Sequence, residues 1–255
     1  MAVDFCYINI ILTGMTSYLL EEIMQWTPPH KPAELTEKRL ITAILDGVFP
    51  INTTLPPERE LAEQLGTTRP TLREALQRLS RDGWIEIHHG KPTRIRDYWK
   101  EGNLSVLASI AEFPNHLPEN FIGNLLVIRQ LMAPTYTRLA VENQPQLVEG
   151  MLAEAMMIKD DALVFSETDW NLHYQFTLAS GNPIFTLILN GFKELYFMMG
   201  EKYFALKQAR DYSRDFYSQL LLCTQNNQPE KAEQITSEVM RQSLNFWKEI
   251  NLQHT

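Results

Sequence analysis

The feature that most restricts the fold of this chain is a turn of only two residues, Thr67 and Thr68, between two amphipathic segments. The first segment, PPERELAEQLG, begins with two prolines, which suit a helix start because a missing N–H costs little there. The second, RPTLREALQRLSRDG, places leucines at relative positions i, i+4 and i+7. Two short helices joined by so tight a turn predict a helix-turn-helix.

The charged residues of the second helix indicate what it contacts. Its buried stripe is predicted to consist of Leu72, Leu76 and Leu79, whereas Arg69 and Arg73 lie on another face. In a recognition helix the N-terminal residues meet the base edges of DNA, and an arginine there can contact N7 and O6 of guanine together. The alternative interpretation is a solvated charged face, but the helix-turn-helix context favours DNA binding.

A β-hairpin is predicted directly after this helix. In GWIEIHHGKPTRIRDY, Ile85, Ile87 and Ile95 alternate with polar residues, which predicts two strands with Gly90 at the tip of their turn. A hairpin in this place is the wing of a winged helix-turn-helix, and Lys91 at its tip can contact phosphate. The two adjacent histidines do not indicate a metal site, because neighbouring strand residues point to opposite faces.

The distribution of charge agrees with a local DNA-binding region. The 255 residues carry a net charge of −8, but residues 31–100 hold 12 basic and 10 acidic side chains. The basic excess is therefore confined to the predicted winged helix-turn-helix. A further helix is predicted at its start, in ELTEKRLITAILDGVFP, where the apolar residues share one face and Gly47 ends the helix.

The first 30 residues are predicted to be an N-terminal extension, with Met15 and Met24 as alternative start positions. The segment FCYINIIL is too short for a signal peptide and no basic residue precedes it. No stretch approaches the roughly 18 apolar residues of a membrane span. The two cysteines predict neither a disulfide framework nor a cysteine-based zinc site. We therefore expect a cytoplasmic protein without a membrane partner.

The second half of the chain is predicted to be an all-α bundle. After a linker at 99–112, helical periodicity continues to about residue 250, with one long helix in LPENFIGNLLVIRQLMAPTYTRLAVEN that kinks near Pro134. The fold class is thus mainly α, with a winged helix-turn-helix domain at 31–98 and a helical domain at 113–250. Further helices are predicted at 145–161, 163–180, 183–206, 208–226 and 229–250.

The helical domain is rich in aromatic residues and methionine, as in GFKELYFMMGEKYF. Ordinary core packing explains any one of these side chains. Together, however, soft methionines and aromatic rings also suit a cavity for a long apolar ligand whose polar head is oriented by tyrosine and arginine.

Two stretches carry a resemblance to a known family. LPPERELAEQLGTTRPTLREALQRLSRDGWI resembles the GntR family of bacterial transcription regulators, and the wing HHGKPTRIRDYW is similar to that of its FadR group, the regulators of fatty acid metabolism. The similarity extends over about residues 33–248. It implies DNA contacts from both helices and the wing tip, namely from Arg59, Arg69, Thr71, Arg73, His89, Gly90 and Lys91. Pro70 departs from the family, which has a hydroxyl residue there.

The same resemblance implies a ligand. Helical domains of the FadR group bind long-chain acyl-CoA, and the residues here that match their ligand contacts are Arg129, Tyr196, Tyr203, Tyr217, Ser243 and Trp247. Met240 stands where the family has glycine, which is expected to narrow or reshape the pocket. The basic residue that helps to hold the coenzyme end has no clear match, although Lys248 is near. No cofactor is implied.

A rival site and two rival functions follow from the residues themselves. Asp169 and His173 are four apart on one helical face, as in relatives that bind a metal and a small carboxylate, but the later histidines of such sites are missing. Two ligands are fewer than zinc requires, so we predict no metal, and we expect His173 to line or border the cavity. The second functional alternative is thus a regulator that senses a small carboxylate through a metal site. The third is an enzyme, and no nucleophile motif supports it.

The leading hypothesis is therefore a transcription regulator, not an enzyme. We expect a homodimer that places two winged heads on a palindromic DNA operator, and long-chain acyl-CoA that disfavours the DNA-bound arrangement. Whether binding to DNA activates or represses transcription, and which acyl chain length is preferred, stay open.

Overall fold

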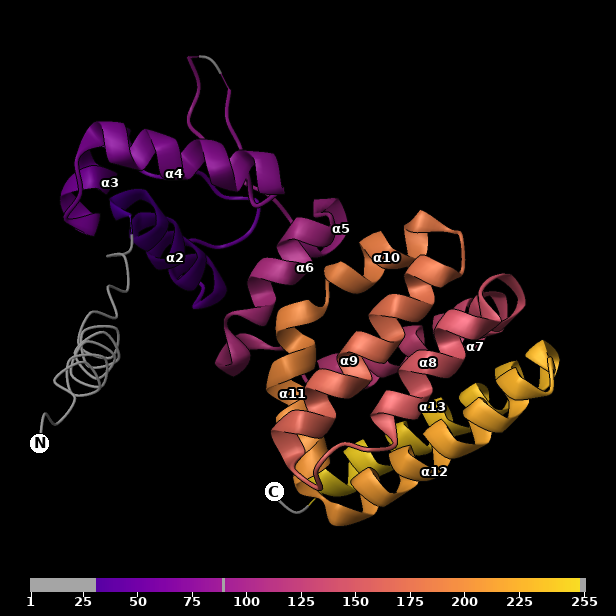
Figure 1. The fold of residues 1–255 in the computed structure, drawn as a ribbon. Coiled ribbons are helices and arrows are strands. Elements are labelled where there is room, and N and C mark those ends of the chain that lie inside the picture. Colours follow the sequence, from indigo (N-terminus) through magenta and orange to yellow (C-terminus); the bar gives the residue numbers. More distant parts are fainter. Residues whose placement is uncertain (1–30, 89, 253–255) are drawn as a thin grey trace, which may run out of the picture.

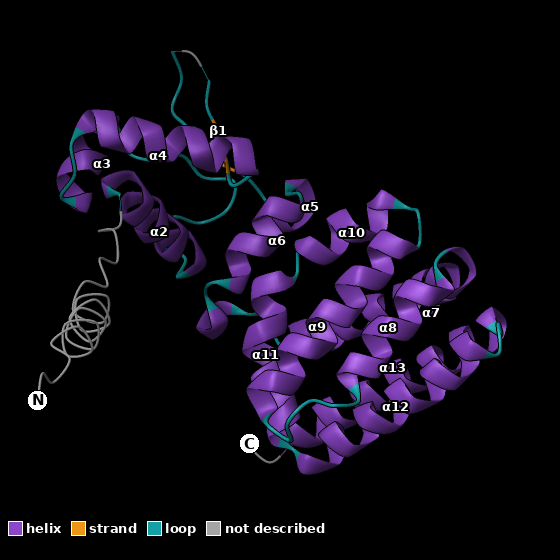
Figure 2. Cartoon of the chain, in the orientation of Figure 1, coloured by secondary structure: helices purple, strands orange, loops and turns teal. Residues whose placement is uncertain are grey.

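The structure, a computed structural model, describes residues 31–88 and 90–252. The N-terminal extension predicted at 1–30 lies outside the described residues. Figure 1 shows a small N-terminal part with a protruding loop, a short helical connector, and a larger bundle of helices. Nearly every described element is a helix, and the strands are confined to the N-terminal part (Figure 2). The predicted fold class is confirmed.

The N-terminal part contains the predicted helix-turn-helix. Helix α2 spans Pro32–Leu45, α3 spans Glu58–Leu65 and α4 spans Arg69–Asp82. The leucine stripe of α4 is buried as predicted and packs on α2 and α3. Gly66 and Gly83, which follow α3 and α4, have φ values of +63° and +98°, a conformation that favours glycine and ends both helices.

Two short strands form the base of the wing. Strand β1 (Ile85–Glu86) pairs antiparallel with β2 (Arg94–Ile95), so that Ile85 lies opposite Ile95, and both isoleucines are fully buried. The predicted alternation was wrong at Ile87, which lies beyond β1 and is 43% exposed. The hairpin leaves the core after two residues, so Ile87 has no buried surface to cover.

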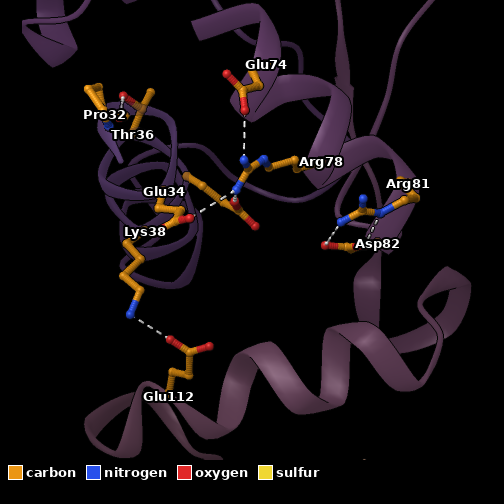
Figure 3. A network of polar contacts seen from close by, with 10 residues as sticks. Pro32, Glu34, Thr36, Lys38, Glu74, Arg78, Arg81, Asp82 and Glu112 are labelled. Atoms are coloured by element: carbon orange, nitrogen blue, oxygen red, sulfur yellow. Dashed lines mark hydrogen bonds and ion pairs between the residues drawn. The ribbon is translucent and has the colours of Figure 1, made fainter. Parts of the chain in front are cut away.

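Ion pairs hold α2 against its neighbours (Figure 3). Arg78 of α4 bonds to Glu74 at 2.7 Å and lies 3.6 Å from Glu37 of α2. Lys38, also on α2, pairs with Glu112 of the connector at 2.8 Å. Because these side chains are partly exposed, the pairs fix orientation more than they add stability.

The connector is helical, although 99–112 was predicted as a linker. It contains α5 (Tyr98–Glu101), α6 (Leu104–Ala111) and the 3₁₀ turn η1 (Pro114–His116). Val106 and Ile110 of α6 are buried in the same apolar cluster as the leucines of α4. The connector is thus packed onto the helix-turn-helix part, which the polar start of its sequence did not indicate.

Seven helices form the larger bundle. α7 packs along α13 and α9 packs along α11, around a second apolar cluster. α7 starts at Phe121, after Asn120 in a left-handed conformation, and continues past a buried Pro134. The helices are α7 (Phe121–Asn143), α8 (Pro145–Ala155), α9 (Ala162–Ala179), α10 (Pro183–Asn190), α11 (Lys193–Ala205), α12 (Lys207–Gln225) and α13 (Pro229–Leu252).

One predicted helix is two. The segment 183–206 divides at Gly191 and Phe192, so that α10 and α11 run in different directions (Figure 1). The N–H of Phe192 donates to the carbonyl oxygen of Leu189 at 2.9 Å, a tight closing turn that ends α10. Gly191 at the break agrees with the division into two helices, because glycine is a weak helix former.

Candidate functional site

The candidate DNA-binding surface lies at the N-terminal end of α4. Thr68 caps this helix, since its hydroxyl oxygen accepts a hydrogen bond from the N–H of Thr71 at 3.3 Å. Arg69 occupies the first helical position and Pro70 the second, where no partner for its missing N–H is needed. Arg69 and Arg73 are both exposed, on a face away from the buried leucines.

Two of the predicted DNA-contacting side chains are already engaged within the protein. Arg73 Nε donates to Glu58 Oε2 at 2.8 Å, which links α4 to the start of α3. The hydroxyl of Thr71 lies 2.8 Å from that of Thr68. Arg59 of α3 is exposed. Glu58 therefore holds the guanidinium of Arg73 in place, and a DNA contact by Arg73 would have to compete with this ion pair.

The tip of the wing carries the remaining predicted contacts. Gly90 has a φ of +72° and nothing within 4 Å of an added Cβ, and Lys91 is exposed. His89 lies outside the described residues. At the base of the wing, Arg94 bonds to Glu86 at 3.1 Å and to Glu101 at 2.7 Å. Arg94 thus fastens the hairpin to α5, so that its role is structural.

The candidate ligand site is an apolar pocket in the bundle, with a volume of about 110 Å³. Its walls come mainly from α7, α11 and α13. Five of the six predicted ligand residues line it, namely Arg129, Tyr196, Tyr203, Ser243 and Trp247. The other lining residues are Ile122, Leu125, Leu126, Ile128, Met132, Tyr136, Leu189, Phe192, Leu195, Met199, Gly200 and Phe204.

The sixth predicted residue, Tyr217, does not line the pocket. It is fully buried on α12, and its hydroxyl donates to Asp169 Oδ1 at 2.9 Å. Met240 is also absent from the lining and lies in the apolar cluster of the bundle. His173 stands one layer behind the wall, where its Nδ1 is 2.8 Å from the hydroxyl of Tyr136.

Sequence reasoning considered Asp169 only as a metal ligand and missed its role as the centre of the polar contacts. Its Oδ2 accepts a hydrogen bond from Arg129 Nη2 at 2.8 Å and another from the hydroxyl of Tyr196. Arg129 also lies over the ring of Tyr196, with 5.3 Å from Cζ to the ring centre. With Tyr217, three donors from three helices converge on one carboxylate. The spacing of Asp169 and His173 was the available signal, but it pointed to a metal.

The environment fixes the charge of each group in this cluster. Burial opposes ionisation of Asp169, but the neighbouring guanidinium of Arg129 and the two tyrosine hydroxyls outweigh it and lower the pKa of Asp169. Burial, with Arg129 nearby, lowers the pKa of His173 to about 3. Burial also raises the pKa of Tyr196 and Tyr217 well above the usual range. Asp169 is therefore an anion and His173 is neutral.

The donors at this place do not fit a metal ion. Within residues 31–88 and 90–252, no three histidine, cysteine, aspartate or glutamate side chains come together to hold one. Both oxygens of Asp169 already accept hydrogen bonds, and His173 Nε2 is 3.9 Å from the nearer oxygen.

Among the helices that the structure describes, none is long and apolar enough to cross a membrane.

Two family models match the chain. The one described as bacterial regulatory proteins, gntR family, matches residues 32–95, and the one described as FadR C-terminal domain matches residues 96–254. Their boundary falls between β2 and α5, so the connector belongs to the second.

Curated relatives give the same result, and one solved structure shares the fold. A fatty acid metabolism regulator protein of Yersinia enterocolitica is 42% identical over 191 residues, which are 75% of this chain and 80% of the relative. The protein of the same name from Shewanella pealeana is 43% identical over 190 residues, 74% of this chain and 79% of the relative. One solved structure is that of Lar, which controls the expression of the Listeria monocytogenes agr system. The match covers 84% of this chain and 95% of the Lar chain, with a TM-score of 0.56 and 15% identity, and it shows a likeness of fold alone.

The resemblance predicted from the winged helix-turn-helix is thereby confirmed over both parts of the molecule. The chain belongs to the GntR family of bacterial regulatory proteins and, within it, to the FadR group, and it is accordingly a transcription regulator of fatty acid metabolism and not an enzyme.

Proposed function

We propose that this regulator binds a long-chain acyl-CoA in the pocket of its helical bundle and then loses affinity for its operator. The observation that carries the proposal is the lining of the pocket, which is apolar except for one arginine, Ser243 and a few tyrosine hydroxyls. Each methylene group of an acyl chain that leaves water for such a lining contributes about 0.8 kcal/mol. The polar groups can orient the thioester.

The size of the pocket supports a change of conformation on binding. Its volume of about 110 Å³ is below the roughly 300–1,000 Å³ of sites that enclose drug-sized ligands. A long acyl chain therefore requires the helices around the pocket to move apart. α11 contributes six of the lining residues and joins α10 through a short turn, so it is the element that we expect to shift.

The packing of α11 supports a route from the pocket to DNA. Leu195 of α11 lines the pocket and also lies in the apolar cluster that contains Val106 and Ile110 of α6. α6 in turn packs on the DNA-binding part. A shift of α11 would thus disturb the placement of the winged heads. The ligand lowers DNA affinity only because it prefers the shifted arrangement.

The proposed DNA complex is that of a homodimer on a palindromic operator. One winged head would occupy each half-site, with the start of α4 in the major groove and the wing tip on the adjacent backbone. The proposed contacts are those of Arg59, Arg69, Thr71, Arg73, His89, Gly90 and Lys91.

The test is a titration of a labelled operator, obtained by selection from random duplexes. Protein is held at a concentration that saturates the operator, and hexadecanoyl-CoA is added. We expect release of DNA with hexadecanoyl-CoA and little change with free CoA, which lacks the apolar chain. Light scattering of the protein without DNA tests whether it is a dimer. Protein that stays on DNA while its pocket is saturated would refute the switch.

A further inference from the structure

The pocket has one charged lining residue in the described part of the chain, and that charge is already neutralised. Arg129 Nη2 lies 2.8 Å from Asp169 Oδ2, and the side chains are only 19% and 7% exposed. Asp169 itself does not line the pocket but stands behind the wall on α9. Wall and carboxylate together therefore present no net charge to a ligand.

The carboxylate of Asp169 is held as a permanent anion by its geometry. Arg129 comes from α7, Tyr196 from α11 and Tyr217 from α12, and each donates a hydrogen bond to it. Three donors, one of which is a guanidinium, favour the charged form of a carboxylate. A ligand that enters the pocket thus meets a guanidinium whose charge is already offset by the fixed charge of Asp169 behind it.

Arg129 nevertheless keeps one donor without a partner. Its Nε is buried and forms no hydrogen bond within the described residues. The carbonyl oxygen of a thioester or an ester can accept a hydrogen bond from such a group without bringing charge. A carboxylate would instead add a second anion to a buried site whose one cation is already paired, which is costly.

We propose that Asp169 is a specificity-determining residue, which makes the pocket accept uncharged acyl derivatives and reject the carboxylate of a free fatty acid. The inference rests on the proposed function, because it assumes that the acyl chain occupies this pocket. It assigns the choice of ligand to a residue that the ligand does not touch.

The first test compares two probes of equal chain length, decanoate and methyl decanoate, by the fluorescence of Trp247 in the pocket wall. At pH 8 we expect wild-type protein to bind the ester about 1,000-fold more tightly than decanoate, because only the protonated acid is accepted and about one carboxyl group in 1,000 carries its proton at that pH. Asp169→Asn has almost the same shape but no charge, so Arg129 becomes available to the carboxylate. We expect the preference for the ester to fall at least about tenfold.

Two further variants separate charge from structure. In Asp169→Asn with Arg129→Gln the site is again neutral, and the wild-type preference should return. Tyr217→Phe removes one hydrogen bond to Asp169 but no charge, so its ratio of affinities should equal that of wild type. A ratio that follows the loss of the hydrogen bond and not the loss of charge would overturn the inference.

The second test needs no variant. No group around the pocket is expected to titrate between pH 6 and 8. Burial lowers the pKa of His173 to about 3 and raises that of Tyr203 to about 12, while Asp169 has a lowered pKa. The pKa values of the other facing groups, Tyr136, Tyr196, Tyr217 and Arg129, are all raised.

Only the protonated acid should then be accepted. Wild-type affinity for decanoate should rise about tenfold for each pH unit between 8 and 6, the signature of one bound proton. Affinity for the methyl ester should stay constant. If decanoate binds as tightly as the ester at both pH values, or if folded Asp169→Asn keeps the wild-type ratio, the inference is wrong. If neither the ester nor hexadecanoyl-CoA binds wild type, the proposed function fails and the inference with it.

Discussion

At the scale of residues, the bundle contains a polar cluster that its apolar surroundings make rigid. Asp169 and His173 lie one turn apart on α9, both buried, and they connect to α7, α11 and α12 through Arg129, Tyr136 and two further tyrosines. In such surroundings an unpaired charge costs far more than at the surface. The charge states are therefore fixed over a wide range of pH, and changing them is expected to cost stability.

His173 should make stability depend on pH. Its pKa is about 3 in the folded protein and near 6.5 in the unfolded chain. Between these values only the unfolded state takes up the proton, so this contribution is complete above pH 6.5 and is lost as the pH falls. We expect the free energy of unfolding to drop by about 1.4 kcal/mol more per pH unit in wild type than in His173→Asn between pH 6 and 4. Urea unfolding at pH 7, 6, 5 and 4 measures the free energy of unfolding of wild type and of His173→Asn. If both free energies fall equally with pH, His173 is not the group that takes up the proton.

Replacement of either arginine of α4 should weaken operator binding without affecting the fold. Arg69 and Arg73 are exposed and lie off the leucine stripe. Loss of a bidentate base contact costs about 1–3 kcal/mol, so we expect Arg69→Ala and Arg73→Ala to lower affinity for the selected operator about 5- to 150-fold. Arg81→Ala is the matched control, because Arg81 is an exposed arginine of the same helix that pairs with Asp82. Band shifts in which all three variants behave alike would refute base recognition by the helix start.

At the scale of elements, the approach of α9 and α11 depends on one small residue. A Cβ atom added to Gly200 of α11 would lie 2.2 Å from Ser166 Oγ and 3.2 Å from Ser166 Cβ, on α9. Gly200 is buried and also lines the pocket, so the contact sets the distance of α11 from the polar cluster. A glycine within a helix is normally a weakness, but here it permits the packing.

Two glycines should therefore respond in opposite ways to alanine. Gly150 lies exposed inside α8, with nothing within 4 Å of an added Cβ. Gly150→Ala should raise the free energy of unfolding by about 0.5–1 kcal/mol through helix propensity. Gly200→Ala should lower the free energy of unfolding by about 1–3 kcal/mol, because overpacking against Ser166 outweighs the gain in helix propensity. Urea unfolding at pH 7 compares them, and equal stabilisation by both substitutions would show that α11 is free to move away.

At the scale of the whole molecule, the two parts share structure through the connector. α6 contributes to the N-terminal apolar cluster, and Leu195 of α11 lies in that same cluster. His116 of η1 bonds to Asp46 at 2.7 Å, and Lys38 bonds to Glu112, so the connector is fastened to the loop after α2 and to α2 itself. A displacement in the bundle therefore has a continuous packed route to the winged head.

Hydrogen exchange should make this route visible. If hexadecanoyl-CoA displaces α11, backbone amides of both α11 and α6 should change their exchange rates, because α6 packs on α11. α8 is the internal control, since none of its residues lines the pocket. Changes confined to α7, α11 and α13 in a sample that has released its operator would show that coupling takes another route.

The sequence by itself determined the winged helix-turn-helix. The two-residue turn, the stripe of Leu72, Leu76 and Leu79, and the glycines after each helix are local signals whose spacing matches the helical period, so they hold in any tertiary context. The six predicted ligand residues were reached in another way, through resemblance to a family, and five of the six lie on the lining of the pocket.

Tertiary structure alone decided the rest. Asp169 meets Arg129, 40 residues away, and Tyr217, 48 residues away, so no local pattern could reveal that the carboxylate pairs with an arginine. Ile87 became exposed because the hairpin leaves the core, and α6 became buried because another part of the chain covers it. Local periodicity fixes which residues share a face, but which surface that face meets depends on contacts between distant segments.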